Sequence, residues 1–162
     1  MLKRPAIIAL FALTATMLSS AQAQTERKTP YWASISSGKA MMRTGPATTY
    51  PATWLYVRAD LPIKVIETYP SWRKIQDPEG VTGWMLVNLL SDTRTALVTG
   101  EGPHPMYESP DTGSKIRYQV QAGVVGRISE CEGNWCQFDV GGRRGFINRD
   151  HIWGTDPGES ID

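Results

Sequence analysis

The sequence predicts an all-β protein made of two tandem copies of one small module, preceded by a segment for export. Three observations predict this class. A Trp-centred pattern occurs twice, apolar and polar residues alternate at the two-residue period of strands, and no long window shows the three- and four-residue spacing of an amphipathic helix. Gly (15) and Pro (11) are also abundant, which favours short strands joined by turns.

Residues 1–23 have the three parts of a secretory signal peptide. Lys3 and Arg4 give a positive start, residues 6–18 are uncharged and mainly apolar, and Ala21-Gln22-Ala23 offers the small-x-small cleavage pattern. The apolar run is shorter than the roughly 20 residues that span a bilayer. We expect cleavage after this signal and a periplasmic or secreted protein with no membrane insertion; the alternative is an uncleaved N-terminal anchor.

The net charge argues against a protein that binds nucleic acid or anionic lipid through general electrostatic attraction. The 162 residues include 17 Lys+Arg and 16 Asp+Glu, a formal net charge of +1, and loss of Lys3 and Arg4 with the signal would change it to −1. A near-neutral chain exerts no general attraction on nucleic acid or anionic lipid. We therefore expect no nucleic-acid partner.

The two cysteines, Cys131 and Cys136, flank four residues of a predicted short hairpin. Two thiols cannot complete a four-ligand zinc site, and their spacing is not that of a C-x-x-C redox motif. In an oxidising compartment a disulfide across the hairpin is the simpler interpretation. The alternative is a pair of free buried thiols.

The repeat is centred on Trp72 and Trp135, which lie 63 residues apart. In each copy an apolar residue, Ile75 or Phe138, follows three positions later. A Gly-bearing turn and a Gly-aromatic-apolar triplet come next (Gly83-Trp84-Met85 and Gly145-Phe146-Ile147). The period is the size of a domain and too long for a solenoid unit.

This repeat predicts two domains: module 1 over residues 31–98 and a divergent module 2 over residues 103–153. The Gly/Pro-rich residues 99–103 are the predicted connector, and residues 154–162 the predicted tail, rich in turn formers and poorly packed. Predicted strands are Ala33–Ser36, Ala40–Arg43, Trp54–Val57, Ile63–Glu67, Trp72–Gln76, Gly83–Leu86, Arg94–Val98, Met106–Glu108, Arg117–Val120, Val124–Ser129, Trp135–Asp139 and Arg144–Ile147. Short 3-10 turns are expected at residues 87–91 and 148–152.

The ordered set of motifs in the first copy resembles the bacterial SH3-like domains of exported and cell-envelope proteins. The residues that carry it are Met42-Arg43-Thr44-Gly45-Pro46, Tyr50-Pro51, Pro62-Ile63, Trp72-x-x-Ile75, Gly80 and Gly83-Trp84. The second copy is similar through Ser109-Pro110, Gly123-Val124, Trp135-x-x-Phe138 and Gly145-Phe146-Ile147, but it lacks Arg-x-Gly-Pro and has Phe146 where Trp is usual. The resemblance implies two small, partly open antiparallel barrels that bind wall peptide or protein.

Residues suited to catalysis are few. His104 and His151 are the two histidines, the cysteines are assigned to each other, and no cluster has the spacing of a metal site. We therefore expect structural histidines, no cofactor, no metal and no enzyme activity.

The aromatic residues are the better functional candidates. Ile75 is predicted to point to the core of module 1, so Trp72 is predicted to face away from it, and Tyr50 falls in a long loop. With Trp54 and Trp84 these rings form the predicted ligand-binding set, led by Trp72 and Tyr50. The alternative is that they fill the core and seal the modules together. The sequence thus predicts an exported, non-catalytic binding module for cell-wall peptide or an envelope protein. The alternatives are a small envelope hydrolase, or a scaffold that pairs through exposed strand edges.

Overall fold

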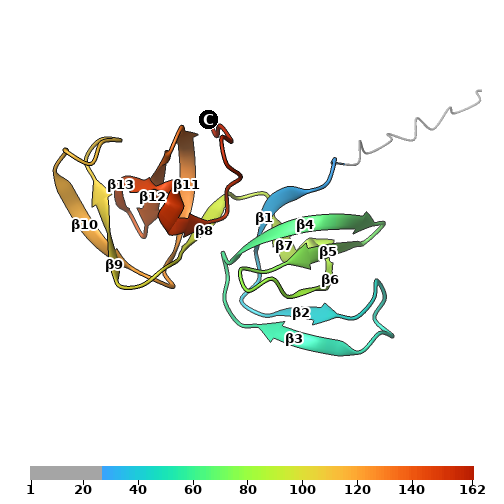
Figure 1. The fold of residues 1–162 in the computed structure, drawn as a ribbon. Coiled ribbons are helices and arrows are strands. Elements are labelled where there is room, and N and C mark those ends of the chain that lie inside the picture. The colour runs from blue at the N-terminus through green and yellow to red at the C-terminus, as the bar shows by residue number, and fades with distance from the viewer. Residues whose placement is uncertain (1–26) are drawn as a thin grey trace, which may run out of the picture.

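A computed structural model describes residues 27–162; the predicted signal peptide lies outside these residues. Figure 1 shows two separate β units along the chain, one drawn from blue to yellow-green and one from yellow to red. Each unit is a seven-stranded antiparallel sheet that coils around its own apolar core. Within the described residues the helical segments are two 3-10 turns, and no helix has the length and apolarity needed to cross a bilayer. The all-β prediction is confirmed.

Module 1 contains the first seven strands. They are β1 (Tyr31–Ile35), β2 (Ala40–Arg43), β3 (Ala52–Tyr56), β4 (Pro62–Tyr69), β5 (Trp72–Gln76), β6 (Thr82–Leu86) and β7 (Leu90–Ser91). A 3-10 turn at Val87–Leu89 separates the last two, as expected. The strand order across the sheet is β3-β2-β6-β5-β4-β1-β7.

Module 2 repeats that arrangement. Its strands are β8 (Thr95–Val98), β9 (Pro103–Tyr107), β10 (Ile116–Gln121), β11 (Val125–Glu132), β12 (Trp135–Val140), β13 (Arg143–Asn148) and β14 (Ile152–Trp153), with a 3-10 turn at Arg149–His151. The order is β10-β9-β13-β12-β11-β8-β14, which is the order of module 1 with every strand number raised by seven. This identity of topology confirms the duplication.

The strand at Thr95–Val98 belongs to the second sheet and not to the first. β8 pairs with β11 and β14, as β1 pairs with β4 and β7 in module 1. The boundary between the sheets therefore falls between Ser91 and Thr95, and residues 99–102 form a turn inside module 2. The Trp-centred motifs do not show this, because the first strand of each module lies far along the chain from the strands it joins.

The cores contain the residues that the alternation predicts. Ile75, between Lys74 and Gln76, is fully buried in module 1, and Phe138 is fully buried at the corresponding place in module 2. Gly126 leaves room for that ring, since a Cβ there would lie 2.6 Å from Phe138 Cζ.

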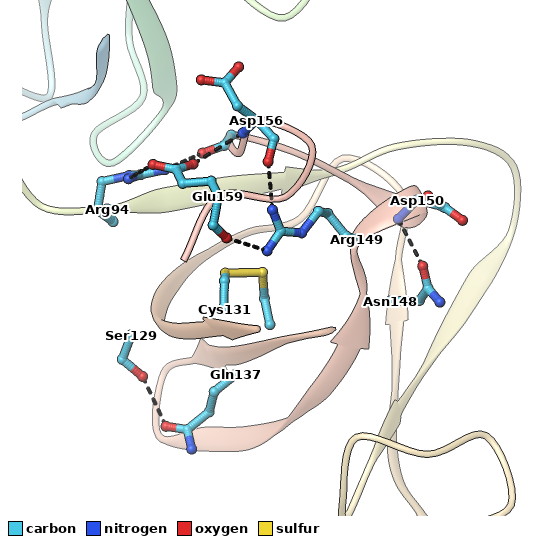
Figure 2. The surroundings of a disulfide bond; sticks show 11 residues. Arg94, Ser129, Cys131, Gln137, Asn148, Arg149, Asp150, Asp156 and Glu159 are labelled. Atoms are coloured by element: carbon cyan, nitrogen blue, oxygen red, sulfur yellow. Dashed lines mark hydrogen bonds and ion pairs between the residues drawn. A yellow bond between two sulfur atoms is a disulfide. The ribbon is translucent and has the colours of Figure 1, made fainter. Parts of the chain in front are cut away.

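The tail at residues 154–162 is held to module 2 by hydrogen bonds and an ion pair, contrary to the expectation of a loose tail, although four of its nine residues are exposed. Ile161 exchanges two backbone hydrogen bonds with Cys131, so the tail pairs with β11 near the end of that strand. Arg94 forms a two-oxygen ion pair with Glu159, and the Arg149 guanidinium donates to the carbonyls of Asp156 and Glu159 (Figure 2). The turn-rich composition hid this packing because its partners are far away in sequence.

The same tail also contacts module 1. Lys64 on β4 forms an ion pair of 2.6 Å with Asp156 and lies over the Trp32 ring. Trp32 meets Trp153 edge to face, with ring centroids 4.7 Å apart. These contacts join the two modules near the tail.

Candidate ligand-binding faces

The outer face of module 1, opposite its core, carries a group of aromatic rings. Strand register pairs Trp72 with Tyr69 and with Leu86, on the side of β5 away from Ile75. Trp84 lies on the same side, paired with Lys74. The direction predicted for Trp72 therefore agrees with the register.

The two tryptophans of this face are nonetheless buried. Trp72 is 7% exposed and Trp84 is 9% exposed, although neither belongs to the apolar core cluster. The exposed Tyr69 ring packs edge-on against Trp84, with centroids 6.4 Å apart. Module 1 thus fills its outer face with its own rings and leaves little of Trp72 or Trp84 for a ligand.

The other two predicted ligand-binding residues are exposed, Tyr50 at 46% and Trp54 at 56%. Tyr50 adjoins the outer face, because its carbonyl accepts a 2.7 Å hydrogen bond from Arg43, which pairs with Trp84. Its ring lies directly over Gly45, where a Cβ would come within 2.5 Å of the ring. Trp54 instead lies on the edge strand β3, where it pairs with the core residue Met42 of β2. The structure therefore separates Trp54 from the other three.

Module 2 carries a cavity of about 620 Å³ at the corresponding place. Its apolar lining includes Trp135, Phe146 and Pro110, and its polar lining includes Glu130, Glu132 and Asp162. Tyr107 packs edge-on against Trp135, with centroids 5.5 Å apart, which holds the indole in place. The disulfide between Cys131 and Cys136, confirmed at a sequence separation of five, ties the strands beside the cavity.

Two replacements explain why module 2 is hollow there. Tyr69 pairs with Trp72 in module 1, whereas Glu132 pairs with Trp135 in module 2. Phe146 likewise takes the place of Trp84, each across from the residue two positions after the motif Trp. A smaller ring and a carboxylate thus occupy the positions that two packed rings fill in module 1.

The prediction from sequence missed this cavity because it favoured the more typical copy. The signal was present in the repeat alignment, where Phe146 stands at the Trp84 position. The tail was also assigned no packing role, although Asp162 lies on the cavity wall.

The two histidines stack on each other in module 2, with ring centroids 4.1 Å apart. Burial, and then the neighbouring His104, lower the pKa of His151, while Asp150 opposes that effect. Among residues 27–162 no three His, Cys, Asp or Glu side chains gather as a metal site would require.

Some solved structures are similar to this chain. One is an NlpC/P60 family protein from Bacillus cereus ATCC 10987, with 13% identity over 76% of this chain and 56% of that protein, at a TM-score of 0.34. NlpC2 and NlpC1 from Trichomonas vaginalis are each 12% identical, over 80% and 82% of this chain and 49% of theirs, at a TM-score of 0.36. This chain therefore spans about half the length of those proteins.

No curated protein is similar enough to this chain to count as a match. The family model of the bacterial SH3 domain, however, matches it twice, at residues 36–92 and 100–154. The matches cover more than half of the sequence, and each contains all the strands of one sheet except its first, β1 or β8. The chain therefore belongs to the bacterial SH3 domain family, with two copies of the domain in tandem.

Proposed function

We propose that the protein is an exported, non-catalytic binding module that recognises cell-wall peptide. The cavity over Trp135 and Phe146 is the observation that carries this proposal. Its volume lies in the range of about 300–1,000 Å³ that is usual for ligand sites, and aromatic rings offer large contact area at low entropic cost. Bacterial SH3 domains are typically binding modules, which agrees with this role.

Export is supported by the disulfide as well as by the signal-like N-terminal sequence. The Cys131–Cys136 bond is the form that thiols adopt in the periplasm or outside the cell. The wall is a ligand that an exported protein meets there. In this proposal the protein holds the peptide and breaks no bond in it.

Retention on insoluble peptidoglycan tests the proposal. The unaltered protein should sediment with the wall, and Trp135→Ala should reduce the retained fraction several-fold, with folding checked by circular dichroism. Tyr118→Ala is the matched control, because Tyr118 is an exposed ring on β10 that does not line this cavity. Equal retention of all three proteins, or none of the unaltered one, would contradict the proposal. So would turnover of wall fragments by the purified protein, which would indicate a hydrolase.

The exposed edge of module 1 favours a second candidate function, a scaffold for an envelope protein. β3 is the outermost strand of its sheet and exposes Trp54 and Leu55. An unpaired edge with apolar side chains can accept an extended strand from a partner. A Leu55→Lys variant that lost an envelope partner in cross-linking, while keeping its retention on the wall, would establish this second role.

A further inference from the structure

We infer that the module 2 cavity binds a cationic side chain of its peptide ligand, an ammonium or a guanidinium group, between its aromatic rings and its three carboxylates. This inference rests on the proposed function, because it specifies the charge of the ligand at the same site. Charge, shape and the comparison between the two modules support it.

The charge of the cavity is of one sign. Three of its lining residues, Glu130, Glu132 and Asp162, are acidic, and no lysine or arginine lines it. None of the three forms an ion pair or a side-chain hydrogen bond with another residue of the described chain.

Elsewhere in module 2 and the tail, some carboxylates have an arginine partner and others do not. Each of three other carboxylates has an arginine partner at 2.6 to 2.9 Å: Glu108 with Arg117, Asp139 with Arg144, and Glu159 with Arg94. Glu101, Asp111 and Asp150 have no ion pair either. What distinguishes the cavity is that three carboxylates without an ion pair line one concave site, where a bound ligand can supply the cation.

The aromatic lining of the cavity suits the same ligand. Trp135 and Phe146 are only partly buried, and a cation over an aromatic face is attracted by the negative face of the ring. The methylene stem of a lysine or arginine side chain can pack against Pro110 and the rings while its charged head meets the carboxylates of the lining.

Module 1 shows that the opening is specific to the second copy. Tyr69 and Trp84 close the equivalent place there, and the corresponding positions in module 2 hold Glu132 and Phe146. The same two positions therefore produce both the hollow and part of its charge. The tandem copies accordingly present different surfaces, and the site for a cationic side chain is in module 2 alone.

A pair of blocked peptides tests the inference on the full-length protein. The probes are Ala-Lys-Ala and the same peptide with an acetylated lysine, and the readout is the shift of the Trp135 indole N–H signal in NMR titrations. We expect the lysine peptide to bind and the acetylated peptide to bind at least about tenfold more weakly. Raising the salt to about 1 M, where the Debye length is about 3 Å, should weaken binding of the lysine peptide.

Two variants locate the site. The double substitution Glu130→Gln/Glu132→Gln should weaken binding of the lysine peptide about tenfold, and Phe146→Trp should block it by filling the cavity as module 1 does. Glu101→Gln is the charge-matched control, since Glu101 is exposed and lies away from the cavity. Thermal unfolding verifies that each variant is folded.

The outcomes separate this inference from the proposed function. Equal binding of the two peptides, or retention on peptidoglycan that Trp135→Ala reduces and the double substitution does not, overturns the inference and leaves the proposed function intact. Selective binding of the lysine peptide without retention on the wall supports the inference and removes the wall as the ligand.

Discussion

Tyr56 and Asp77 form a buried polar pair in module 1. The Tyr56 hydroxyl donates a 2.9 Å hydrogen bond to the Asp77 carboxylate, which also accepts from the backbone N–H groups of Glu79 and Val81. Burial, and then the bond to Asp77, raise the pKa of Tyr56 well above its ordinary value. The Asp77 carboxylate thus accepts three hydrogen bonds and stabilises the β5–β6 turn.

Tyr56→Phe should therefore destabilise module 1. The substitution removes one donor from a carboxylate that is only 3% exposed, which costs about 1–3 kcal/mol of unfolding free energy. Urea denaturation measures the effect, and Tyr50→Phe is the control because Tyr50 is exposed. Equal stability of the two variants would show that the hydroxyl of Tyr56 contributes nothing.

The lowered pKa of His151 predicts that the stability of module 2 depends on pH. Its folded pKa lies below the ordinary value of 6.5, so the unfolded state binds the proton first. The contribution of neutral His151 to the unfolding free energy should be fully present above about pH 6.5 and be lost as the pH falls through the folded pKa. Thermal unfolding between pH 7.5 and 5 measures this slope. His151→Gln should flatten it, and His104→Gln should reduce it in part by removing the repulsion; three identical slopes would contradict the assignment.

At the scale of elements, the disulfide closes the hairpin between β11 and β12. Because it encloses only a short loop, the chain-entropy model gives about 2 kcal/mol, at the lower end for disulfides. Reduction should lower the unfolding free energy of module 2 by about this amount. The double variant Cys131→Ala/Cys136→Ala, measured with and without reductant, is the control and should not respond.

The tail is the second element with a measurable role. Burial raises the pKa of Glu159, but hydrogen bonds from Arg94 and from the Asp156 N–H outweigh it, so the pKa lies below its ordinary value. The contribution of this carboxylate is therefore present above about pH 4.5 and is lost as the pH falls through the folded pKa.

Glu159→Gln should loosen the tail at neutral pH. Loss of a two-oxygen pair that is largely buried should cost about 1.5–3 kcal/mol, the range for hydrogen bonds to charged groups. Hydrogen exchange of the Cys131 and Ile161 amides, which bond the tail to β11, should become faster. The control is Asp150→Asn, on the exposed end of the 3-10 turn; unchanged exchange in Glu159→Gln would contradict this role.

At the scale of the whole molecule, contacts between the modules predict that they tumble together. Lys64 pairs with Asp156, and Arg58 donates to the carbonyl of Gly123 across the interface. In ¹⁵N relaxation both modules should share one correlation time, and Lys64→Ala/Arg58→Ala should separate the two values. Lys74→Ala is the control, because its partner Glu67 is in module 1. Separate values in the unaltered protein would overturn the prediction.

The local chemistry of the chain predicted most of the fold. Alternation around Trp72 and Trp135 located the central hairpins, and the strand predicted at Ile63–Glu67 lies within β4. The pairing of Cys131 with Cys136 was predicted as well. These features depend on neighbours in the sequence, where side-chain period, turn residues and spacing act directly.

The candidate site could be predicted only in part. The direction of Trp72 follows from its parity in the strand, but its burial depends on rings supplied by other strands, among them Tyr69 and Trp84. The cavity in module 2 needs Pro110, Phe146 and Asp162 to meet, and these residues are far apart in the chain.

By itself, the sequence determined the strand class, the duplication and the disulfide, because each follows from a local periodicity or a fixed spacing. Only the tertiary structure decided that Thr95–Val98 belongs to the second sheet, that the tail packs along β11, and that module 2 is hollow where module 1 is filled. The physical reason is that sheet partners and cavity walls are chosen by contacts between distant segments, and the periodicity of one segment does not identify its partners.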